Sequence, residues 1–258
     1  HVPTTPAVPA PSRSADGTSP PSPHRATTLI AYVFDSPVPY RTALAWQHAL
    51  VAATLLARGD PSSSSASPAA APRASNAAAA AAAALLVLEH PAVYTLGTGA
   101  SLAHLRFDPA SEPGLDLVRA DRGGEVTYHG PGQLVAYPVV DLEAIGMRDL
   151  HGYVRALEEA VIRTVAHFAG DGGVAGGGRV AGRVAGRPGV WVSSGKVAAL
   201  GVRVRKWVAF HGVALNLVGA LVAPGFARIV PCGIEGAGVA ALDGVVAAAG
   251  RGAVGRGE

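Results

Sequence analysis

Apolar and polar positions in the first part of the chain alternate between strand-like and helix-like spacing. Residues 28–34 (TLIAYVF) are β-branched and aromatic, which predicts a strand, and 41–58 carries apolar residues near helical spacing before a Gly-Asp-Pro stop. A further strand is expected at 85–90. The clearest helix spans 150–168, where apolar residues recur at steps of three or four on one face: Leu150, Val154, Leu157, Val161, Val165 and Phe168.

In the second half of the chain the pattern mainly predicts strands. Residues 124–130 and 134–140 flank a Gly-Pro-Gly turn, and 189–193, 196–204 and 208–218 follow one another through tight polar turns such as Ser194-Gly195. Helices and strands alternate irregularly, without the strict rhythm of a doubly wound fold. We therefore expect an α+β fold (α/β in a looser usage), with a mixed, mostly antiparallel sheet and helices packed on it.

Three segments have a composition that does not form a core. Residues 1–27 are rich in Pro, Ser, Thr and Ala, 59–84 is a Ser/Ala tract, and 170–189 contains a slipped Arg-Val-Ala-Gly repeat. Such tracts bury too little apolar surface to offset chain entropy. We interpret 1–27 as a disordered leader, a possible remnant of a transit peptide because it is Ser-rich and poor in acidic residues, and the other two as surface insertions in one domain over 28–258.

Charge and cysteine content narrow the function classes. A net charge of +3 and a pI near 9.3 fall short of the basic stripe of a nucleic-acid binder, and suit either an acidic protein partner or an ordinary Arg-rich surface. The longest apolar run, 77–88, is too short to span a bilayer, so we expect a soluble protein with no membrane partner. A single cysteine agrees with a reducing compartment, and without a ligand cluster no metal site is expected.

Two side chains carry candidate chemistry. Cys232 lies in a Pro-Cys-Gly sequence, and a lone cysteine is either a small buried apolar residue or a nucleophile. Lys196 is one of only two lysines in a chain with 19 arginines. A partly desolvated lysine can exchange a proton, whereas arginine stays protonated, so Lys196 is either such a group or a solvated turn residue. An ammonium beside a thiolate would stabilise the attacking sulfur.

A glycine-rich stretch, RGGEVTYHGPGQ (122–133), precedes a buried strand. It matches neither a Walker pattern nor a dinucleotide fingerprint, so it predicts either a loop that lets the backbone approach a ligand or an Arg-capped hairpin. Arg122, Thr127, Tyr128 and His129 would line the pocket. His129 and His211 each precede a glycine, and are either general bases or hydrogen-bonding residues of the pocket wall.

Four motifs in this order and spacing resemble lipoate-protein octanoyltransferases, particularly their cyanobacterial and plastid branch: RGGEVTYHGPGQLVAYP, GKVAALGVR, FHGVALNL and PCG. The resemblance runs from about residue 28 to 234 and implies a biotin/lipoate protein ligase-like catalytic fold. It implies a dyad in which Cys232 accepts the acyl group as a thioester and Lys196 acts as acid and base. The acyl-binding segments it implies are Arg122, Gly123, Gly124, Glu125, Val126, Thr127, Tyr128 and His129, then Ala199, Leu200 and Gly201, and finally Gly212, Val213 and Ala214.

The family also implies the reaction and its partners. The donor would be octanoyl-acyl carrier protein, and the acceptors would be lysines on the lipoyl domains of 2-oxoacid dehydrogenase complexes and on the glycine cleavage H-protein. No cofactor, metal or ATP is implied, and Arg203, Arg205 and Lys206 are candidate docking cations or a solvated edge. The alternatives are an ATP-dependent lipoate or biotin ligase, a non-catalytic binding module, and a cysteine hydrolase using a histidine. The plastid stroma is the expected location, with the mitochondrion as the alternative.

Overall fold

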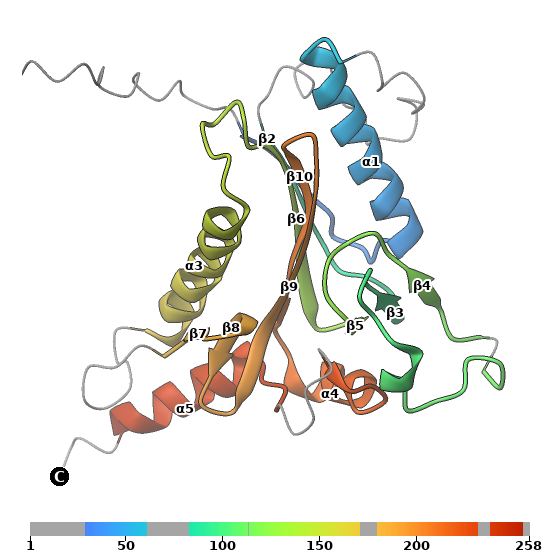
Figure 1. Ribbon diagram of the computed structural model, residues 1–258. Helices are drawn as coiled ribbons and strands as arrows, with labels where there is room; N and C mark the ends of the chain where they lie inside the picture. Colours follow the sequence, from blue (N-terminus) through green and yellow to red (C-terminus); the bar gives the residue numbers. More distant parts are fainter. Residues whose placement is uncertain (1–28, 61–82, 113, 171–179, 232–237, 255–258) are drawn as a thin grey trace, which may run out of the picture.

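The computed structural model describes residues 29–60, 83–112, 114–170, 180–231 and 238–254 (Figure 1). The expected leader at 1–27, most of the insertion expected at 59–84 and Cys232 lie outside the described residues. No helix in the described ranges is long and apolar enough to cross a membrane.

A seven-stranded sheet forms the centre of the molecule, in the order β1-β2-β6-β10-β9-β8-β7. Neighbouring strands are antiparallel except β1 and β2, which are parallel. The expected mixed, mostly antiparallel sheet is therefore confirmed. In chain order the strands are β1 (Leu29–Val33), β2 (Ala83–Leu88), β6 (Gln133–Asp141), β7 (Gly182–Val184), β8 (Arg187–Val192), β9 (Gly195–Arg205) and β10 (Val208–Asn216).

A smaller three-stranded sheet lies beside the first and was only partly expected. Its order is β4-β3-β5, with β3 parallel to β4 and antiparallel to β5. Only β5 had been predicted, because four residues of β3 and three of β4 are too few to show a periodic pattern. The strands are β3 (Val93–Leu96), β4 (Leu117–Arg119) and β5 (Val126–His129), and a short 3-10 helix (Leu102–His104) follows β3.

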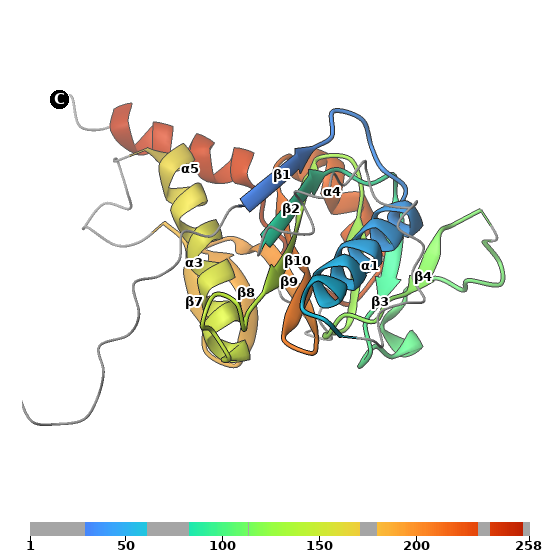
Figure 2. The same cartoon turned by 90° about the horizontal axis from the view of Figure 1, so that it is seen from above.

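Helices cover both faces of the large sheet. Helix α1 (Tyr40–Ala57) packs Leu50, Val51 and Leu55 against β2, β6 and β10, whereas α3 (Leu150–Ala169) and α5 (Leu242–Val254) pack on the opposite face. Helix α4 (Gly219–Phe226) packs against the small sheet. Figure 1 shows α1 and α3 on opposite sides of the central strands, and Figure 2 shows α3 beside β7 and β8.

The predicted helix over 150–168 is confirmed as α3, but its buried face is turned. Val161 and Val165 are buried as expected, whereas Leu150 and Phe168 are 42% and 57% exposed. Ile162 and Ala169 are buried instead, one position away from the expected stripe. The buried face of α3 therefore also includes Glu158, a polar residue that a search for apolar periodicity does not pick up.

The second expected insertion is partly sheet. Residues 182–184 form the edge strand β7 and 187–189 begin β8, inside the 170–189 segment that we expected to be irregular. Backbone pairing of Gly182 with Trp191 extends the sheet without any apolar pattern. Arg183 ties this edge to α3 through ion pairs with Glu158 (2.9 Å) and Glu159 (3.0 Å).

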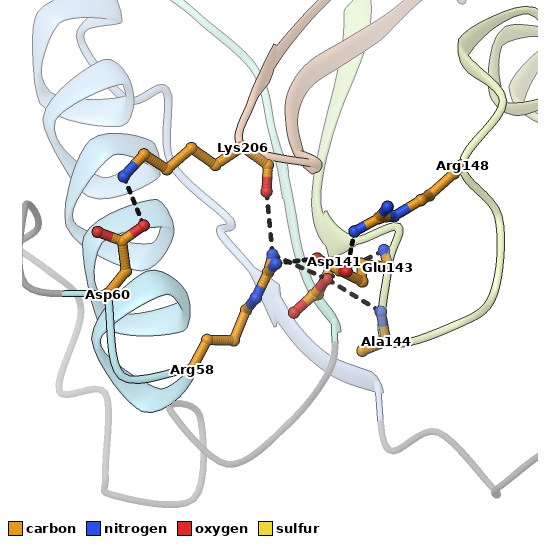
Figure 3. A network of polar contacts seen from close by, with 7 residues as sticks. All are labelled: Arg58, Asp60, Asp141, Glu143, Ala144, Arg148 and Lys206. Atoms are coloured by element: carbon orange, nitrogen blue, oxygen red, sulfur yellow. Dashed lines mark hydrogen bonds and ion pairs between the residues drawn. The ribbon is translucent and has the colours of Figure 1, made fainter.

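The tip of the β9–β10 hairpin is tied to α1 by a polar network (Figure 3). Lys206 and the next residue both adopt positive φ, which makes the tight turn. Arg58, just after α1, donates to the carbonyl of Lys206 (3.0 Å) and contacts both Asp141 and Glu143. Lys206 Nζ contacts Asp60 at 2.6 Å. The network fixes the far ends of β6, β9 and β10 relative to α1.

Candidate active site

A cavity of about 610 Å³ lies between the glycine-rich loop, β6, β9, β10, the first turns of α3 and the β7–β8 turn. Most of the residues singled out from the sequence line it together. These are Arg122, Gly123, Gly124, Glu125, Val126, Thr127, His129, Lys196, Ala199, Leu200, Gly201, Gly212, Val213 and Ala214. Segments some 90 residues apart in the chain thus meet at one site.

Tyr128 is the exception and needs correction. We expected it to line the pocket, but its ring packs against Tyr94 (5.3 Å between centroids) and Phe226 (5.7 Å) in the core under the small sheet. Successive side chains of a strand point to opposite faces. Because Thr127 and His129 of β5 line the cavity, Tyr128 between them faces the core.

Arg122 lines the cavity and at the same time holds the loop in place. Its guanidinium donates to the carbonyl (2.9 Å) and hydroxyl (2.7 Å) of Thr95, and to the carbonyls of Gly123 and Glu125, both at 3.1 Å. The stretch is therefore not a hairpin: β5 pairs with β3 and β6 pairs with β2 and β10, while Arg122 holds the loop that precedes β5. A Cβ at Gly201 would lie 3.0 Å from the Arg122 side chain, so glycine there allows the loop to approach β9.

His129 is buried at one end of the cavity. Its Nδ1 lies 2.7 Å from Oε1 of Gln133, whose amide nitrogen donates to Asn216 (2.9 Å). That amide must therefore accept from the histidine, so Nδ1 carries the proton. Burial, reinforced by the nearby His90 and Arg122, holds the pKa of His129 well below its ordinary value. The ring is a neutral part of the wall.

His211 pairs with a residue that the sequence argument missed. Its Nε2–H donates to Oδ1 of Asp121 at 2.8 Å, and this hydrogen bond lowers the pKa of Asp121 to about 2. Burial lowers the pKa of His211 itself. His211 has a positive φ of 59°, and its backbone N–H donates to Gln47 (2.8 Å). Asp121 directly precedes the glycine-rich loop, which was the available signal.

Lys196 lies at the other end. Its Nζ donates to the carbonyl of Pro188 (2.9 Å) and stands 4.8 Å from the centroid of the Trp191 ring. Lys196 also lines a neighbouring small cavity of about 20 Å³, together with Pro231 and Gly238. These two residues are the described neighbours of segment 232–237, and Lys196 N–H donates to the Gly238 carbonyl at 2.8 Å. Cys232 lies in that segment, outside the described residues.

The remaining walls are apolar or come from unpredicted residues. Valines from three strands, Val135, Val202 and Val213, face the cavity, and Leu150 and Val154 of α3 close one side. Tyr40 and Tyr137 also line it, although nothing in their local sequence distinguishes them from core residues. In the described part of the chain, no group of three His, Cys, Asp or Glu side chains could hold a metal ion.

Comparison with known proteins identifies the protein family of this chain and several of its relatives. The family described as "Lipoyl protein ligase A/B catalytic domain" matches residues 39–249. An octanoyltransferase of Thermosynechococcus vestitus is 47% identical over 197 residues, 76% of this chain and 72% of that protein. One from Gloeobacter violaceus is 46% identical over the same shares. Octanoyltransferase LIP2p2, chloroplastic, of Arabidopsis thaliana is 48% identical over 162 residues, 62% of this chain and 53% of that protein.

Within the lipoyl protein ligase A/B catalytic domain family, the chain belongs to the octanoyltransferases, which are acyltransferases. The expected ligase-like α+β fold is thereby confirmed. A crystal structure of lipoate-protein ligase A bound with ATP aligns with a TM-score of 0.49 and 18% identity, over 88% of this chain and 83% of that one.

Proposed function

We propose that this protein transfers an octanoyl group from octanoyl-acyl carrier protein to a lysine ε-amine of lipoyl domains, through a thioester on Cys232. The observation that carries the proposal is the single cavity that joins the glycine-rich loop to Lys196. Its apolar walls suit a saturated chain, since each buried CH₂ contributes about 0.8 kcal/mol. Family membership supplies the reaction class.

The first half of the reaction forms the acyl-enzyme. The Cys232 thiolate attacks the carbonyl carbon of the octanoyl thioester, a carbon–sulfur bond to the protein forms, and the carrier's thiolate leaves and takes up a proton. Backbone N–H groups near the strand ends stabilise the oxyanion. The position of Pro231 beside Lys196 supports a meeting of sulfur and amine, because Pro231 is bonded directly to Cys232.

In the second half the acceptor lysine attacks this thioester. Its nitrogen forms the amide bond and loses a proton to Lys196, while the Cys232 thiolate leaves. Arginine cannot take this role because it stays protonated. The product is an octanoyl amide on a lipoyl domain, including that of the glycine cleavage H-protein.

His211 does not act as a base in this scheme. His211 lies opposite Val202 in the β9–β10 ladder, six residues along β9 from Lys196. At about 3.3 Å per residue this is roughly 20 Å, too far for proton exchange at the same carbonyl. His129 and His211 instead form part of the wall, with their ring N–H groups held by Gln133 and Asp121.

An acidic carrier would meet cations near the opening of the cavity. Arg187 lines the cavity and is exposed. Arg203, Arg205 and Lys206 lie toward the hairpin tip, ten residues from Lys196 at the farthest, where Lys206 already pairs with Asp60. We therefore assign docking to Arg187 and treat the other three as a solvated edge. Because the relatives are cyanobacterial or, in Arabidopsis, chloroplastic, we propose the plastid as the location.

Intact-mass spectrometry after incubation with octanoyl-carrier protein tests the proposal. The wild type should gain one octanoyl group, and Cys232→Ser and Lys196→Ala should gain none while keeping the wild-type melting temperature. Acylation of a lipoyl domain that requires ATP and survives Cys232→Ser would instead establish a ligase. Tight carrier binding without an adduct would establish a binding module, and release of octanoate to water a hydrolase.

A further inference from the structure

Glu158 is a buried carboxylate that the mechanism above does not use. It lies on α3, in contact with Arg183 of β7 and Gly189 of β8, and is only 6% exposed. One oxygen, Oε2, accepts from Nε of Arg183 at 2.9 Å. The other, Oε1, accepts from the backbone N–H of Gly189 at 3.0 Å. A buried carboxylate is costly unless its oxygens are satisfied, so this arrangement requires both contacts.

The Gly189 N–H belongs to the same peptide unit as the carbonyl of Pro188. That carbonyl accepts from Nζ of Lys196 at 2.9 Å. Because a peptide unit is planar, its N–H and C=O point in opposite directions. The Glu158 carboxylate and the Lys196 amine therefore bind opposite edges of one peptide. A negative group at the N–H edge polarises the unit and strengthens acceptance at the carbonyl edge.

The packing of Gly189 also links Lys196 to the Pro188–Gly189 peptide. Gly189 has a φ of +124°, and a Cβ at this position would lie 2.8 Å from the carbonyl oxygen of Ala198 and 3.1 Å from Cε of Lys196. The aliphatic stem of Lys196 therefore lies directly on Gly189. The Trp191 ring bounds the amine as well, with Nζ 4.8 Å from the ring centroid. A shift of the Pro188–Gly189 peptide would thus move both the partner and the support of the lysine.

We propose that Glu158 is a positioning residue for Lys196: acting through the Pro188–Gly189 peptide, it fixes the direction of the ε-amine. Arg183 holds the other oxygen of Glu158 and so fixes the carboxylate in turn. The inference rests on the proposed function for its catalytic meaning. The arrangement itself can be tested without turnover.

The scarcity of lysine gives a direct measurement. The chain has only Lys196 and Lys206, so NMR of protein labelled with ¹³C at lysine Cε shows two side-chain signals, which Lys206→Arg assigns. In Glu158→Leu the Gly189 N–H loses its acceptor, so the Lys196 signal should change in chemical shift and narrow, because the amine is held less tightly against the Pro188 carbonyl and the Trp191 ring. Glu158→Gln keeps an amide oxygen as acceptor for Gly189 and should restore the wild-type signal.

Two controls separate this role from simple packing of α3. Glu159→Leu removes the neighbouring carboxylate, which pairs with Arg183 and Arg163, and should leave the Lys196 signal in place. The Lys206 signal should stay in place in every variant. If Glu158 only stabilises the fold, Glu158→Leu lowers the melting temperature while the Lys196 signal stays as in the wild type, and the proposal is overturned. Should Glu158→Leu not fold, Arg183→Gln, which frees one oxygen of Glu158, should change the Lys196 signal in the same way, and no change there overturns the proposal.

The catalytic consequence is read from the rate of octanoyl-adduct formation. In Glu158→Leu the rate of adduct formation should fall roughly fivefold at every pH, and Glu158→Gln should restore it. If the wild type forms no adduct at all, the proposed function fails, whereas the NMR signal still decides the role of Glu158. An unchanged adduct rate in Glu158→Leu would refute the positioning role only.

Discussion

The two ends of the cavity are built from different chemistry. At the amine end, Lys196 lies half buried between the Pro188 carbonyl and the Trp191 ring. At the histidine end, His211 lies opposite Val202, about 20 Å along β9 from Lys196, and Tyr40, Tyr137 and His129 line the same cavity. A cation partly in contact with water can exchange protons, whereas a fully enclosed group is driven to its neutral state.

Burial acts on these four rings in that direction. It raises the pKa of Tyr40 to about 12 and that of Tyr137 well above its ordinary value, and it lowers the pKa of both histidines. All four groups are therefore uncharged near neutral pH. The comparison shows that an ionisable residue in a cavity wall need not be charged: four ionisable rings here make a neutral wall.

The largest expected effect on activity concerns Lys196, at the amine end of the cavity. Lys196→Arg keeps the positive charge and the donor to Pro188 but cannot exchange a proton, so octanoyl transfer to a lipoyl domain should fall by about a thousandfold. Lys206→Arg is the matched control, because it changes the only other lysine and should keep full activity. Single-turnover mass spectrometry measures both. A fully active Lys196→Arg would refute the proton-exchange role.

Much of this site was accessible from the sequence because its parts lie in strong local patterns. The glycine-rich stretch, Lys196 and the strand over 208–218 were each assigned correctly to a turn or strand, and the structure brings them to one cavity. Long elements with regular spacing, such as α1 and the β9–β10 hairpin, were predicted for the same reason.

What could not be predicted depends on tertiary contacts. Tyr128 was misplaced because the face of a four-residue strand is set by its partners, here Tyr94 and Phe226. Glu158 was hidden within an apolar helix face, and its significance depends on Gly189, 31 residues away. Helices α4 and α5 were missed because they contain poor helix formers, Pro224 in α4 and Gly244 and Gly250 in α5.

A second prediction concerns the stability of the fold at acidic pH, and it tests whether burial at the histidine end keeps side chains neutral. His90 lies directly behind it, fully buried, with Nδ1 2.6 Å from the Val38 carbonyl and Nε2 2.8 Å from the Tyr137 hydroxyl. Burial lowers its pKa to about 4. Between this value and the unfolded value near 6.5, the unfolded chain binds more protons, so stability is complete above pH 6.5 and declines as the pH falls toward 4.

For His90 alone this loss amounts to about 3 kcal/mol. Urea unfolding at pH 7, 6, 5 and 4 should therefore show a shallower pH dependence for His90→Gln than for the wild type, although the variant is less stable at pH 7. His167→Gln, at an exposed position of α3, should keep the wild-type slope. Equal slopes for wild type and His90→Gln would mean that His90 is not held neutral, and the neutral-wall interpretation would fail there.

The smallest expected effect concerns the preference for the length of the acyl chain. Tyr40 lines the cavity, and its hydroxyl is buried without a hydrogen-bond partner among the described residues. An apolar chain that reaches this hydroxyl places its end against a polar atom that it cannot satisfy, a penalty that the longer chain meets and the shorter chain avoids. Tyr40→Phe removes that penalty, so the rate with decanoyl relative to octanoyl carrier should rise about three- to fivefold.

Tyr153→Phe supplies the matched control, because its hydroxyl is likewise buried without a described partner but Tyr153 is not a cavity residue. Both ratios come from competition between the two carriers, read by intact mass. An unchanged ratio in Tyr40→Phe, or the same rise in both variants, would show that the histidine end does not measure the acyl chain.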